Sequence, residues 1–427
     1  MTQIRDVAAR MKLESPAMAA SSAEQRNDAL ARIKAALVAN SEKIFSANAE
    51  DLAAAEKNGI APAIVKRLRF DDHKLADVCA GIDGLIDLPD PVGRVLLRRE
   101  LDEGLTLVRQ SCPIGVIGVI FEARPDALVQ ISSLCIKSGN CAILKGGSET
   151  LHTNKALFQV IHAAAVDAGL PEGCLYQVEA REDIALLLDC FGLVDLLIPR
   201  GSNSFVRYIM DNTKIPVMGH ADGICHIYVD EDADVEKSVG VVVDAKVQYT
   251  AACNAVETLL VHRGIAPTFL PALARALGAE GVTIRGTEEV QAIVPCDPAT
   301  ESDWSTEYLA LTISVKLVDS VDEAISHINR YGSHHTDAIM TENDATADHF
   351  MQLVDSAGVY QNCSTRFADG FRYGFGAEVG ISTSKLHARG PVGLDGLVTY
   401  KYKLYGHGQI VGDYASGRSQ FHFRDLS

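Results

Sequence analysis

The chain has 427 residues, of which 47% are hydrophobic and 22% are charged, so it can bury a sizeable core and wholesale disorder is excluded. Its 56 acidic residues outnumber its 39 basic residues, and the net charge of −17 disfavours binding to nucleic acids and anionic membranes. The sequence has no apolar run of the ~18 residues that a membrane helix needs, and its charged start lacks the apolar region of a secretory signal.

The ten cysteines are irregularly spaced and form no C-x-x-C pair. This pattern disfavours zinc scaffolds and disulfide frameworks. Scattered cysteines in an acidic chain of this size are typical of a reducing compartment. We therefore expect a cytoplasmic protein with no metal site.

The first 112 residues contain two kinds of pattern. Residues 1–90 predict helices, because alanine-rich, charged segments such as 19–52 carry apolar residues at helical spacing. The segment 94–112 has two apolar runs, 95–97 and 105–108, on either side of a polar stretch. This second pattern predicts a β-hairpin.

From residue 113 onward, apolar strands alternate with helices. We predict strands at 114–121, 141–144, 175–178, 194–198 and 216–218, and helices at 126–137, 150–168, 184–190 and 205–211. Strand–helix units joined by short loops predict right-handed crossovers and a parallel sheet covered on both faces. The fold class is therefore α/β, with a doubly wound, Rossmann-type domain.

A second α/β block runs from about 226 to 380. We expect its strands at 227–229, 259–262, 314–318 and 338–340, and its helices at 267–277 and 322–329. The tail alternates weakly over 397–404, which predicts a strand that adds to another sheet, in this chain or in a second subunit.

Two strand-to-helix loops have the composition of anion sites. The loop Lys145-Gly146-Gly147-Ser148 follows a strand, and its glycines let the backbone approach a phosphate or ribose. The segment Arg200-Gly201-Ser202 offers backbone N–H groups at a helix N-terminus. Spacing alone leaves two alternatives open, a tight turn with a solvated lysine and a helix capped by the Ser202 side chain.

Cys253 has the best setting for a nucleophile among the ten cysteines. It lies among small and polar residues at 248–255, whereas most other cysteines lie in apolar runs. A nucleophilic thiol needs access and a lowered pKa, and such a loop suits both. Cys363 ranks second. The alternative for any single cysteine is a buried structural role.

Several arginines and histidines lie in loops. Arginine recognises carboxylates and phosphates through two parallel hydrogen bonds, so we expect one or two members of this set to face a ligand: Arg124, Arg366, Arg372 and Arg389. The adjacent His334 and His335 should point apart and do not predict a metal pair. We interpret these two, and His220 and His226, as structural residues or substrate contacts.

Four long segments together carry a resemblance to a known family. Residues 219–230, 248–258, 318–339 and 366–393 are similar to the aldehyde dehydrogenase superfamily, most closely to its glutamate-5-semialdehyde dehydrogenase branch. The resemblance implies a cofactor-binding domain at 1–93 and 113–225, a catalytic domain at 226–396, and a β oligomerisation arm at 94–112 and 397–427. It also implies a homodimer or homotetramer.

The resemblance further implies the reaction. It implies NADPH-dependent reduction of L-glutamyl 5-phosphate to L-glutamate 5-semialdehyde and phosphate, the second step of proline biosynthesis from glutamate, with glutamate 5-kinase as the pathway neighbour. A CoA-acylating aldehyde dehydrogenase is the alternative. Cys253 matches the nucleophile that forms the thioester. The cofactor-contacting positions match Lys145, in the loop Lys145-Gly146-Gly147-Ser148, then Gly201-Ser202 and Glu307.

The chain departs from hydrolytic members of the superfamily at two places. The segment 219–223 lacks the glutamate that activates water, which suits an enzyme that releases phosphate. The residues around Arg124 replace a Trp-Asn pair that supplies an oxyanion donor. We therefore expect Arg124, or Asn254 with the Cys253 backbone N–H, to bind the acyl-phosphate oxygens. Arg366 or Arg389 is expected to bind the substrate carboxylate.

Overall fold

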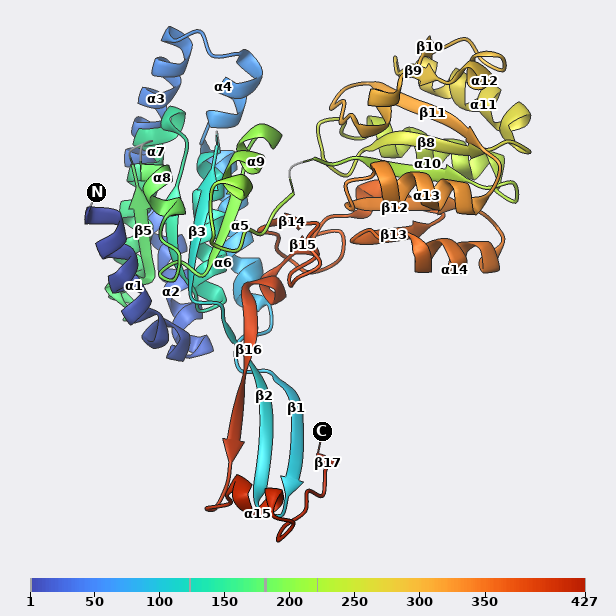
Figure 1. Ribbon diagram of the computed structural model, residues 1–427. Helices are drawn as coiled ribbons and strands as arrows, with labels where there is room; N and C mark the ends of the chain where they lie inside the picture. The colour runs from blue at the N-terminus through green and yellow to red at the C-terminus, as the bar shows by residue number, and fades with distance from the viewer. Residues whose placement is uncertain (1, 123, 180–182, 221, 427) are drawn as a thin grey trace. The chain divides into compact units, whose positions relative to one another are not determined.

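The computed structural model describes residues 2–122, 124–179, 183–220 and 222–426, and the chain divides into two compact units (Figure 1). Unit 1 comprises Met1–Met218 and Val392–Ser427, and unit 2 comprises Gly219–Pro391. In the described ranges, no helix is both long enough and apolar enough to cross a membrane. The division into cofactor domain, catalytic domain and arm stays a prediction.

Unit 1 contains a parallel sheet in the order β5-β4-β3-β6. Its strands are β3 (Val116–Phe121), β4 (Cys141–Lys145), β5 (Leu175–Val178) and β6 (Leu196–Arg200). Every residue of β3 and β4 is buried, as expected for apolar strands covered on both faces. The predicted parallel α/β sheet is confirmed.

Helices surround this sheet. The N-terminal helices are α1 (Thr2–Ala20), α2 (Ala23–Ala39), α3 (Ser41–Lys57), α4 (Pro62–Leu68) and α5 (Asp72–Asp87). Those between and after the strands are α6 (Pro125–Lys137), η1 (Ser148–Thr150), α7 (Leu151–Asp167), η2 (Glu172–Cys174), α8 (Asp183–Leu188) and α9 (Asn203–Asp211). Helices α2 and α3 pack on α7, and α5 packs on α6. The helical prediction for 1–90 is confirmed.

One strand prediction in unit 1 is wrong. Segment 216–218 makes only an isolated parallel bridge between Val217 and Leu197. Two backbone hydrogen bonds of 2.8 Å join it to Leu197, and Pro216 has no N–H to extend the ladder. The chain then passes into unit 2 at Gly219, so the segment ends the sheet without adding a full strand.

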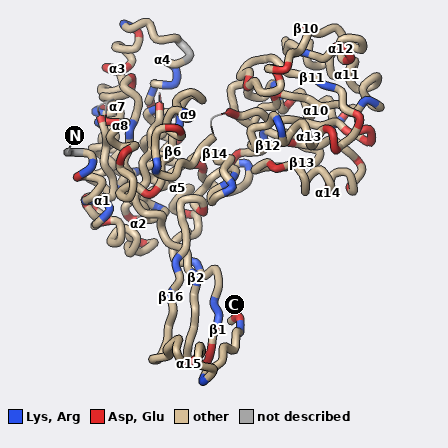
Figure 2. The backbone as a smooth tube through the Cα atoms, in the orientation of Figure 1, with Lys and Arg blue, Asp and Glu red and all other residues tan. Residues whose placement is uncertain are grey.

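The predicted hairpin and the tail form one antiparallel sheet in the order β16-β2-β1-β17. Strands β1 (Val95–Asp102) and β2 (Leu105–Pro113) join at Gly104, whose φ of 70° suits a tight turn. Strand β16 (Val398–Tyr405) pairs with β2 along its whole length, and β17 (Arg424–Asp425) pairs with β1. The tail therefore adds to its own chain, ahead of α15 (Val411–Ala415). Figure 2 shows basic residues along these strands.

Unit 2 contains a parallel sheet in the order β10-β9-β11-β8-β7-β12-β13. The strands are β7 (Cys225–Val229), β8 (Val256–His262), β9 (Thr283–Gly286), β10 (Asp297–Pro298), β11 (Thr312–Val318), β12 (Thr336–Met340) and β13 (Gly358–Gln361). The predicted strands at 227–229, 259–262, 314–318 and 338–340 lie within β7, β8, β11 and β12. Residues 380–382 and 390–392 form a separate pair, β14 (Gly380–Ser382) and β15 (Gly390–Val392).

Alternating side chains of this sheet build two cores. Val229 and Val261 face one cluster, with residues of α10 (Val235–Val247) and α11 (Ala266–Ala279). Tyr228 and Leu260 face the other, with residues of α13 (Val321–Tyr331) and α14 (Asp344–Leu353). Successive side chains of a strand point to opposite faces of the sheet, and here both faces are buried. The remaining helical pieces are α12 (Glu288–Gln291), η3 (Glu301–Ser305), η4 (Thr365–Phe367) and, in unit 1, η5 (Leu394–Leu397).

Strand direction in unit 2 decides which loops meet. Strands β8, β7 and β12 are consecutive neighbours and run parallel. Their amino ends therefore lie at one edge of the sheet. The loops that precede Cys225, Val256 and Thr336 are brought together there.

Candidate active site

Cys253 lies in the turn between α10 and β8, just before the strand begins. A hydrogen bond of 2.9 Å from Ala255 N to Ala252 O closes this turn. Cys253 is half-buried, whereas Asn254 and Ala255 are buried. The thiol therefore projects from a fixed backbone while keeping some solvent access.

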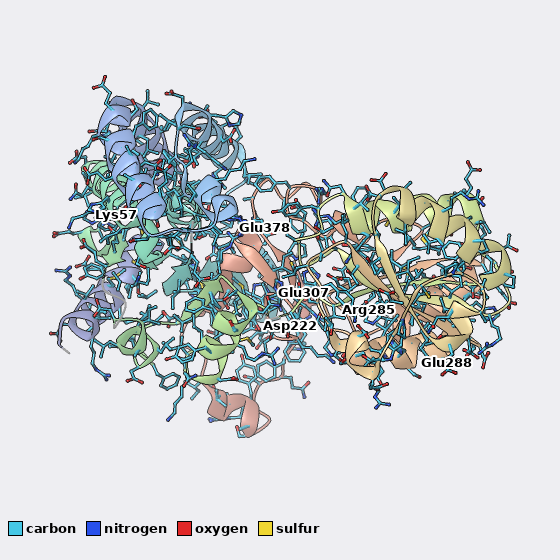
Figure 3. All side chains as sticks on the ribbon, turned by 90° about the horizontal axis from the view of Figure 1, so that it is seen from above. Lys57, Asp222, Arg285, Glu288, Glu307 and Glu378 are labelled. Atoms are coloured by element: carbon cyan, nitrogen blue, oxygen red, sulfur yellow. The ribbon has the colours of Figure 1, made fainter. Side chains whose placement is uncertain are left out.

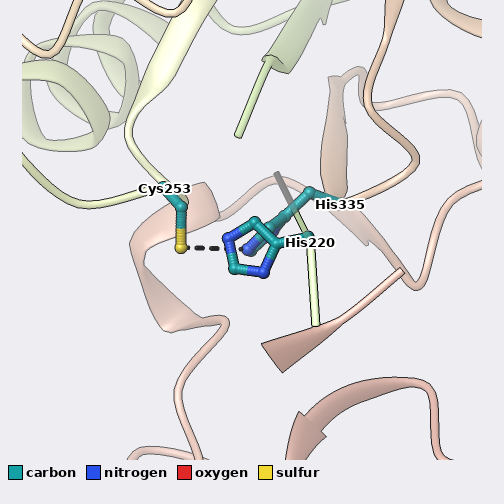
Figure 4. Close-up of side chains that lie close together, drawn as sticks. All are labelled: His220, Cys253 and His335. Atoms are coloured by element: carbon teal, nitrogen blue, oxygen red, sulfur yellow. Dashed lines mark hydrogen bonds between the residues drawn. The ribbon is translucent and has the colours of Figure 1, made fainter. Parts of the chain in front are cut away.

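His335 is the close partner of this thiol. Its Nε2 lies 3.2 Å from Cys253 Sγ (Figure 4), and its Nδ1 lies 2.9 Å from Thr336 Oγ1. The side chain is buried and immediately precedes β12. The preceding residue, His334, has a φ of 59°, and its Nδ1 lies 2.6 Å from Asp355 O. The turn thus holds His335 in one orientation.

His220 completes a cluster of three reactive groups. Its ring centroid lies 4.9 Å from that of His335, at an interplanar angle of 80°. Its Nδ1 lies 2.9 Å from Ile381 O. A carbonyl only accepts hydrogen bonds, so this nitrogen carries the proton and the neutral ring keeps its lone pair on Nε2. One ligand-type atom from each of His220, Cys253 and His335 lies within 4.8 Å of the others.

Gly223 packs against the nucleophile's backbone. A Cβ on Gly223 would overlap Cys253 O and lie 2.5 Å from Cys253 Cα. On the same side, Cys225 Sγ donates to Cys253 O at 3.3 Å. The loop before β7 therefore fixes the position of Cys253, and only glycine leaves room for that approach.

Arg366 is the predicted substrate residue that the structure brings to this cluster. It is buried in η4, its Nε donates to Gln248 Oε1 at 2.9 Å, and its Cζ lies 5.9 Å from the Tyr249 ring centroid. Burial lowers the pKa of Arg366, Arg372 lowers it further, and the charge of Cys253 opposes both effects. The contacts with Gln248 and Tyr249 thus anchor the guanidinium against the loop that carries Cys253.

Asn254 and Arg389 already have protein partners. Asn254 Nδ2 donates to Ala368 O at 2.8 Å, and its buried Oδ1 has no hydrogen-bond partner among the described residues. Arg389 donates to Asp355 Oδ1 at 3.2 Å. The unpartnered atom of Asn254 is an acceptor, which cannot stabilise an oxyanion. The binding roles predicted for both residues stay predictions.

Glu307 lies in the loop between η3 and β11, in unit 2 with Arg285 (Figure 3). A fully buried ion pair, Lys246 Nζ to Glu257 Oε2 at 2.5 Å, anchors this loop, because Leu309 N donates to the other Glu257 oxygen at 3.3 Å. Burial raises the pKa of Glu257 to about 7. The neighbouring charge of Glu307 adds to that shift.

The loop Lys145-Gly146-Gly147-Ser148 follows β4 in unit 1. Lys145 is buried, and its Nζ donates to Gly146 O at 2.5 Å, so the alternative of a solvated lysine is wrong. A Cβ on Gly146 would overlap Asn154 Nδ2. Asn154 Oδ1 is buried without a hydrogen-bond partner among the described residues. The loop is therefore packed tightly against Asn154, which leaves one unsatisfied acceptor there.

Gly201 and Ser202 lie at the start of α9 and contact a carboxylate. Ser202 N donates to Glu122 Oε2 at 3.2 Å, and a Cβ on Gly201 would lie 2.5 Å from the same oxygen. The Ser202 hydroxyl makes no capping bond and lies 3.4 Å from Ser204 Oγ, so the alternative of a side-chain cap is wrong. Arg124 is exposed at the N-cap of α6, and Ala123 beside it lies outside the described residues.

The surroundings of the other cysteines favour the protonated thiol over the thiolate. All ten are free. Burial raises the pKa of Cys363, raises that of Cys225 well above its usual range, and raises three others to about 12: Cys135, Cys141 and Cys174. Such thiols are poor nucleophiles at neutral pH.

Sequence reasoning missed the grouping of His220 and His335 with Cys253. It correctly separated His334 from His335, since the first contacts Asp355 O and the second Cys253 Sγ. The partners are 82 residues apart in the chain. The only signal in the sequence is that Cys253 and His335 both precede a predicted strand. This signal predicts that the two residues meet only once the order of the strands is known.

Comparisons with known proteins agree over nearly the full length. A model of the aldehyde dehydrogenase family matches residues 1–292. The gamma-glutamyl phosphate reductase of Pelotomaculum thermopropionicum is 57% identical over 424 residues, covering 99% of this chain and 98% of that protein. The one from Picosynechococcus sp. is 55% identical over 426 residues and covers 100% of both chains.

Solved structures give the same result. The crystal structure of gamma-glutamyl phosphate reductase from Thermotoga maritima has a TM-score of 0.93 at 39% identity, covering 95% of this chain and 99% of that one. An acetylating aldehyde dehydrogenase from Geobacillus thermoglucosidasius has a TM-score of 0.65 at 15% identity, covering 96% and 97%. The second similarity concerns the fold alone, and the predicted aldehyde dehydrogenase fold is confirmed.

Proposed function

The chain belongs to the aldehyde dehydrogenase family and, within it, to the gamma-glutamyl phosphate reductases, and from this premise we propose that it reduces L-glutamyl 5-phosphate to L-glutamate 5-semialdehyde through a thioester at Cys253. The step belongs to proline biosynthesis. The observation that carries the mechanism is the contact of 3.2 Å between Cys253 Sγ and His335 Nε2.

His335 is the base that ionises the nucleophile. An ordinary thiol has a pKa of ~8.5 and is mostly protonated at neutral pH. The Nε2 of His335 takes the thiol proton, while Thr336 Oγ1 accepts from its Nδ1–H. The thiolate and the imidazolium then stabilise each other. Arg366, buried in η4, is held by Gln248 at the start of the loop that carries Cys253.

The first chemical step exchanges phosphate for sulfur. The Cys253 thiolate attacks the acyl carbon, the C–S bond forms, the bond from carbon to the bridging phosphate oxygen breaks, and inorganic phosphate leaves with the electron pair. Arg366 is our proposal for the residue that binds an anionic group of the substrate, and its burial close to the loop of Cys253 supports this role. Arg124 and the Cys253 backbone N–H are our further proposals for the acyl-phosphate oxygens, and Arg389 is the second proposal for the carboxylate.

The thioester must survive until it is reduced. No glutamate occurs in the segment 219–223, so this segment supplies no carboxylate base of that type to activate water. This absence from the sequence supports release of the acyl group as aldehyde over its hydrolysis.

The cofactor that we propose is NADPH. The residues present fit a dinucleotide: Gly146 and Gly147 end β4 in a loop without bulky side chains, Asn154 Oδ1 is an unsatisfied acceptor next to Gly146, and Lys145 supplies charge. Gly201 and Ser202 lie at the N-terminus of α9, where a phosphate of the cofactor would replace the Glu122 carboxylate as acceptor of the Ser202 N–H. Glu307 is our proposal for the nicotinamide ribose. When bound, NADPH supplies the hydride that reduces the acyl group.

The setting of the enzyme is also a proposal. Ten free cysteines support a reducing compartment such as the cytoplasm. The β16 edge of the antiparallel sheet supports a homodimer or homotetramer. A separate glutamate 5-kinase would supply the acyl phosphate.

The reverse reaction tests this function. The purified protein would be mixed with glutamate semialdehyde, in equilibrium with its cyclic form, and NADP, with and without inorganic phosphate. We expect nicotinamide reduction that depends strictly on phosphate and is lost in Cys253→Ser. Reduction that needs CoA, or that proceeds with neither CoA nor phosphate, would contradict the proposal.

A further inference from the structure

We propose that His220, Cys253 and His335 form a reversible zinc site, in which the metal covers the nucleophile and inhibits the enzyme. The binding part stands on the geometry of the three side chains, and the inhibitory part rests on the proposed function of Cys253. This site departs from the expectation that the chain holds no metal.

The donor atoms have the spacing that zinc needs. Tetrahedral Zn²⁺ with bonds of ~2.3 Å to sulfur and ~2.05 Å to nitrogen places its donors about 3.3–3.6 Å apart. Cys253 Sγ and His335 Nε2 are already 3.2 Å apart, and all three donors lie within 4.8 Å of one another. Small side-chain adjustments would therefore close the site around an ion.

Both imidazoles are oriented as metal ligands usually are. A histidine that binds a metal through one nitrogen normally uses the other for a hydrogen bond, which fixes its tautomer. The Nδ1 of His220 contacts Ile381 O at 2.9 Å, and the Nδ1 of His335 contacts Thr336 Oγ1 at 2.9 Å. In the neutral state with protonated Nδ1, each ring offers the lone pair of Nε2.

The donor types select the metal. One thiolate and two imidazoles suit Zn²⁺ and disfavour Mg²⁺ and Ca²⁺, which need oxygen ligands. Three protein donors leave a fourth position for water. Cys253 and His220 are only half-buried, so an ion can reach them from solvent, while buried His335 forms the floor.

Binding and inhibition follow from the same bond. Zinc forms a bond to Cys253 Sγ, and the proton shared by the thiol and His335 is released to solvent. The sulfur lone pair that would attack the acyl carbon is then held by the metal. Inhibition should therefore be reversed by a chelator.

The test measures binding directly, without turnover. The full-length protein would be dialysed against ZnCl₂, and Co²⁺ would serve as a spectroscopic probe, since a thiolate–cobalt bond gives a charge-transfer band in the near ultraviolet. The variants are Cys253→Ser, His220→Gln and His335→Gln. Cys363→Ser is the matched control, because this half-buried thiol lies in the same unit. Thermal melts of each variant would show that it is folded.

We expect one zinc per chain, a cobalt–thiolate band that Cys253→Ser removes, and a dissociation constant raised at least about tenfold in each of the three variants. The Cys363→Ser control should bind as the unaltered protein does. Zinc should also block iodoacetamide labelling of Cys253 in the unaltered protein.

Two results would overturn the site. One is no stoichiometric binding, and the other is binding that His220→Gln or Cys253→Ser leaves unchanged. A failure of the proposed function would give a different result. Turnover would then survive in Cys253→Ser, whether or not the protein binds zinc.

Discussion

At the scale of the residue, the proposed chemistry depends on the contact between Cys253 and His335. The contact of 3.2 Å leaves the imidazole as the nearest described base for the thiol. Thr336 on one side and the left-handed His334 on the other hold the ring. A non-glycine residue at a φ of 59° is uncommon and costs of order 1 kcal/mol, so packing around this turn must maintain it.

Replacing His335 should therefore change the rate and its pH dependence together. We expect His335→Gln to lower kcat by about 10²–10⁴-fold, the usual contribution of a positioned acid–base group. The residual rate should keep rising toward the alkaline range, because the thiol must then ionise unaided. The measurement is a kcat profile from pH 6 to 9.

A merely structural role for His335 predicts another outcome. The profile would then keep the shape of the unaltered enzyme at a reduced amplitude. His349→Gln is the control, since that side chain is exposed on α14 in the same unit and contacts Asp322.

At the scale of the element, buried polar groups tie the helices of unit 2 to its sheet. His327 of α13 is buried against His226 of β7, with ring centroids 5.7 Å apart, and Trp304 of η3 packs on its other side at 5.5 Å. Its Nε2 has no hydrogen-bond partner in the described part of the chain. Burial, together with the smaller effects of the neighbouring charges of His226 and Lys316, lowers the pKa of His327 to about 3.

This pKa makes stability fall in acid. In the unfolded chain His327 takes up a proton below pH ~6.5, whereas in the folded chain it stays neutral down to about pH 3. Unfolding therefore takes up a proton within that window, and the free energy of unfolding falls as pH falls through it. Between pH 7.5 and 5.5 this one group should cost about 1.4 kcal/mol.

The check is a pair of thermal melts at pH 7.5 and 5.5. We expect the loss of Tm on acidification to be smaller in His327→Gln than in the unaltered protein. His152→Gln is the control, because His152 is exposed in unit 1. An identical acid dependence in all three proteins would contradict the assignment.

Most elements could be predicted from the sequence where pattern and environment agree. The strand predicted at 175–178 coincides with β5, and the apolar run at 114–121 contains β3. Helix α10 was not predicted, because its run of β-branched valines favours a strand when taken alone and tertiary packing makes it helical. Segment 216–218 has strand composition, but it has only one neighbour, since the chain leaves the sheet there.

The site could be predicted in part for a similar reason. Cys253 is identified by its small and polar neighbours, which is local information. His335 requires the order β8-β7-β12, which is set by the packing of the whole sheet. The usual rule places ligands at the carboxyl ends of parallel strands, whereas Cys253 and His335 lie at the amino edge in unit 2.

At the scale of the whole molecule, the net charge of −17 works against self-association. The antiparallel sheet of β16, β2, β1 and β17 is a part of the surface where another copy of the chain could still bind. Its edge strand β16 carries exposed Tyr400, Tyr402 and Tyr405 next to Lys401 and Lys403. An exposed edge with large aromatic side chains is the usual place for a strand or sheet of another copy to add.

The homo-oligomer that we propose should therefore depend on this strand. We expect Tyr402→Asp to lower the mass measured by light scattering to that of one chain, 45.9 kDa, because a buried, unpaired carboxylate disfavours the interface. Tyr208→Asp, which changes an exposed tyrosine on α9 instead, should keep the mass of the unaltered protein. If Tyr402→Asp kept the oligomeric mass while Tyr208→Asp lost it, the interface would lie on the surface of α9. Because the residues proposed for catalysis lie outside β16, dissociation should leave Cys253 open to alkylation at an unchanged rate.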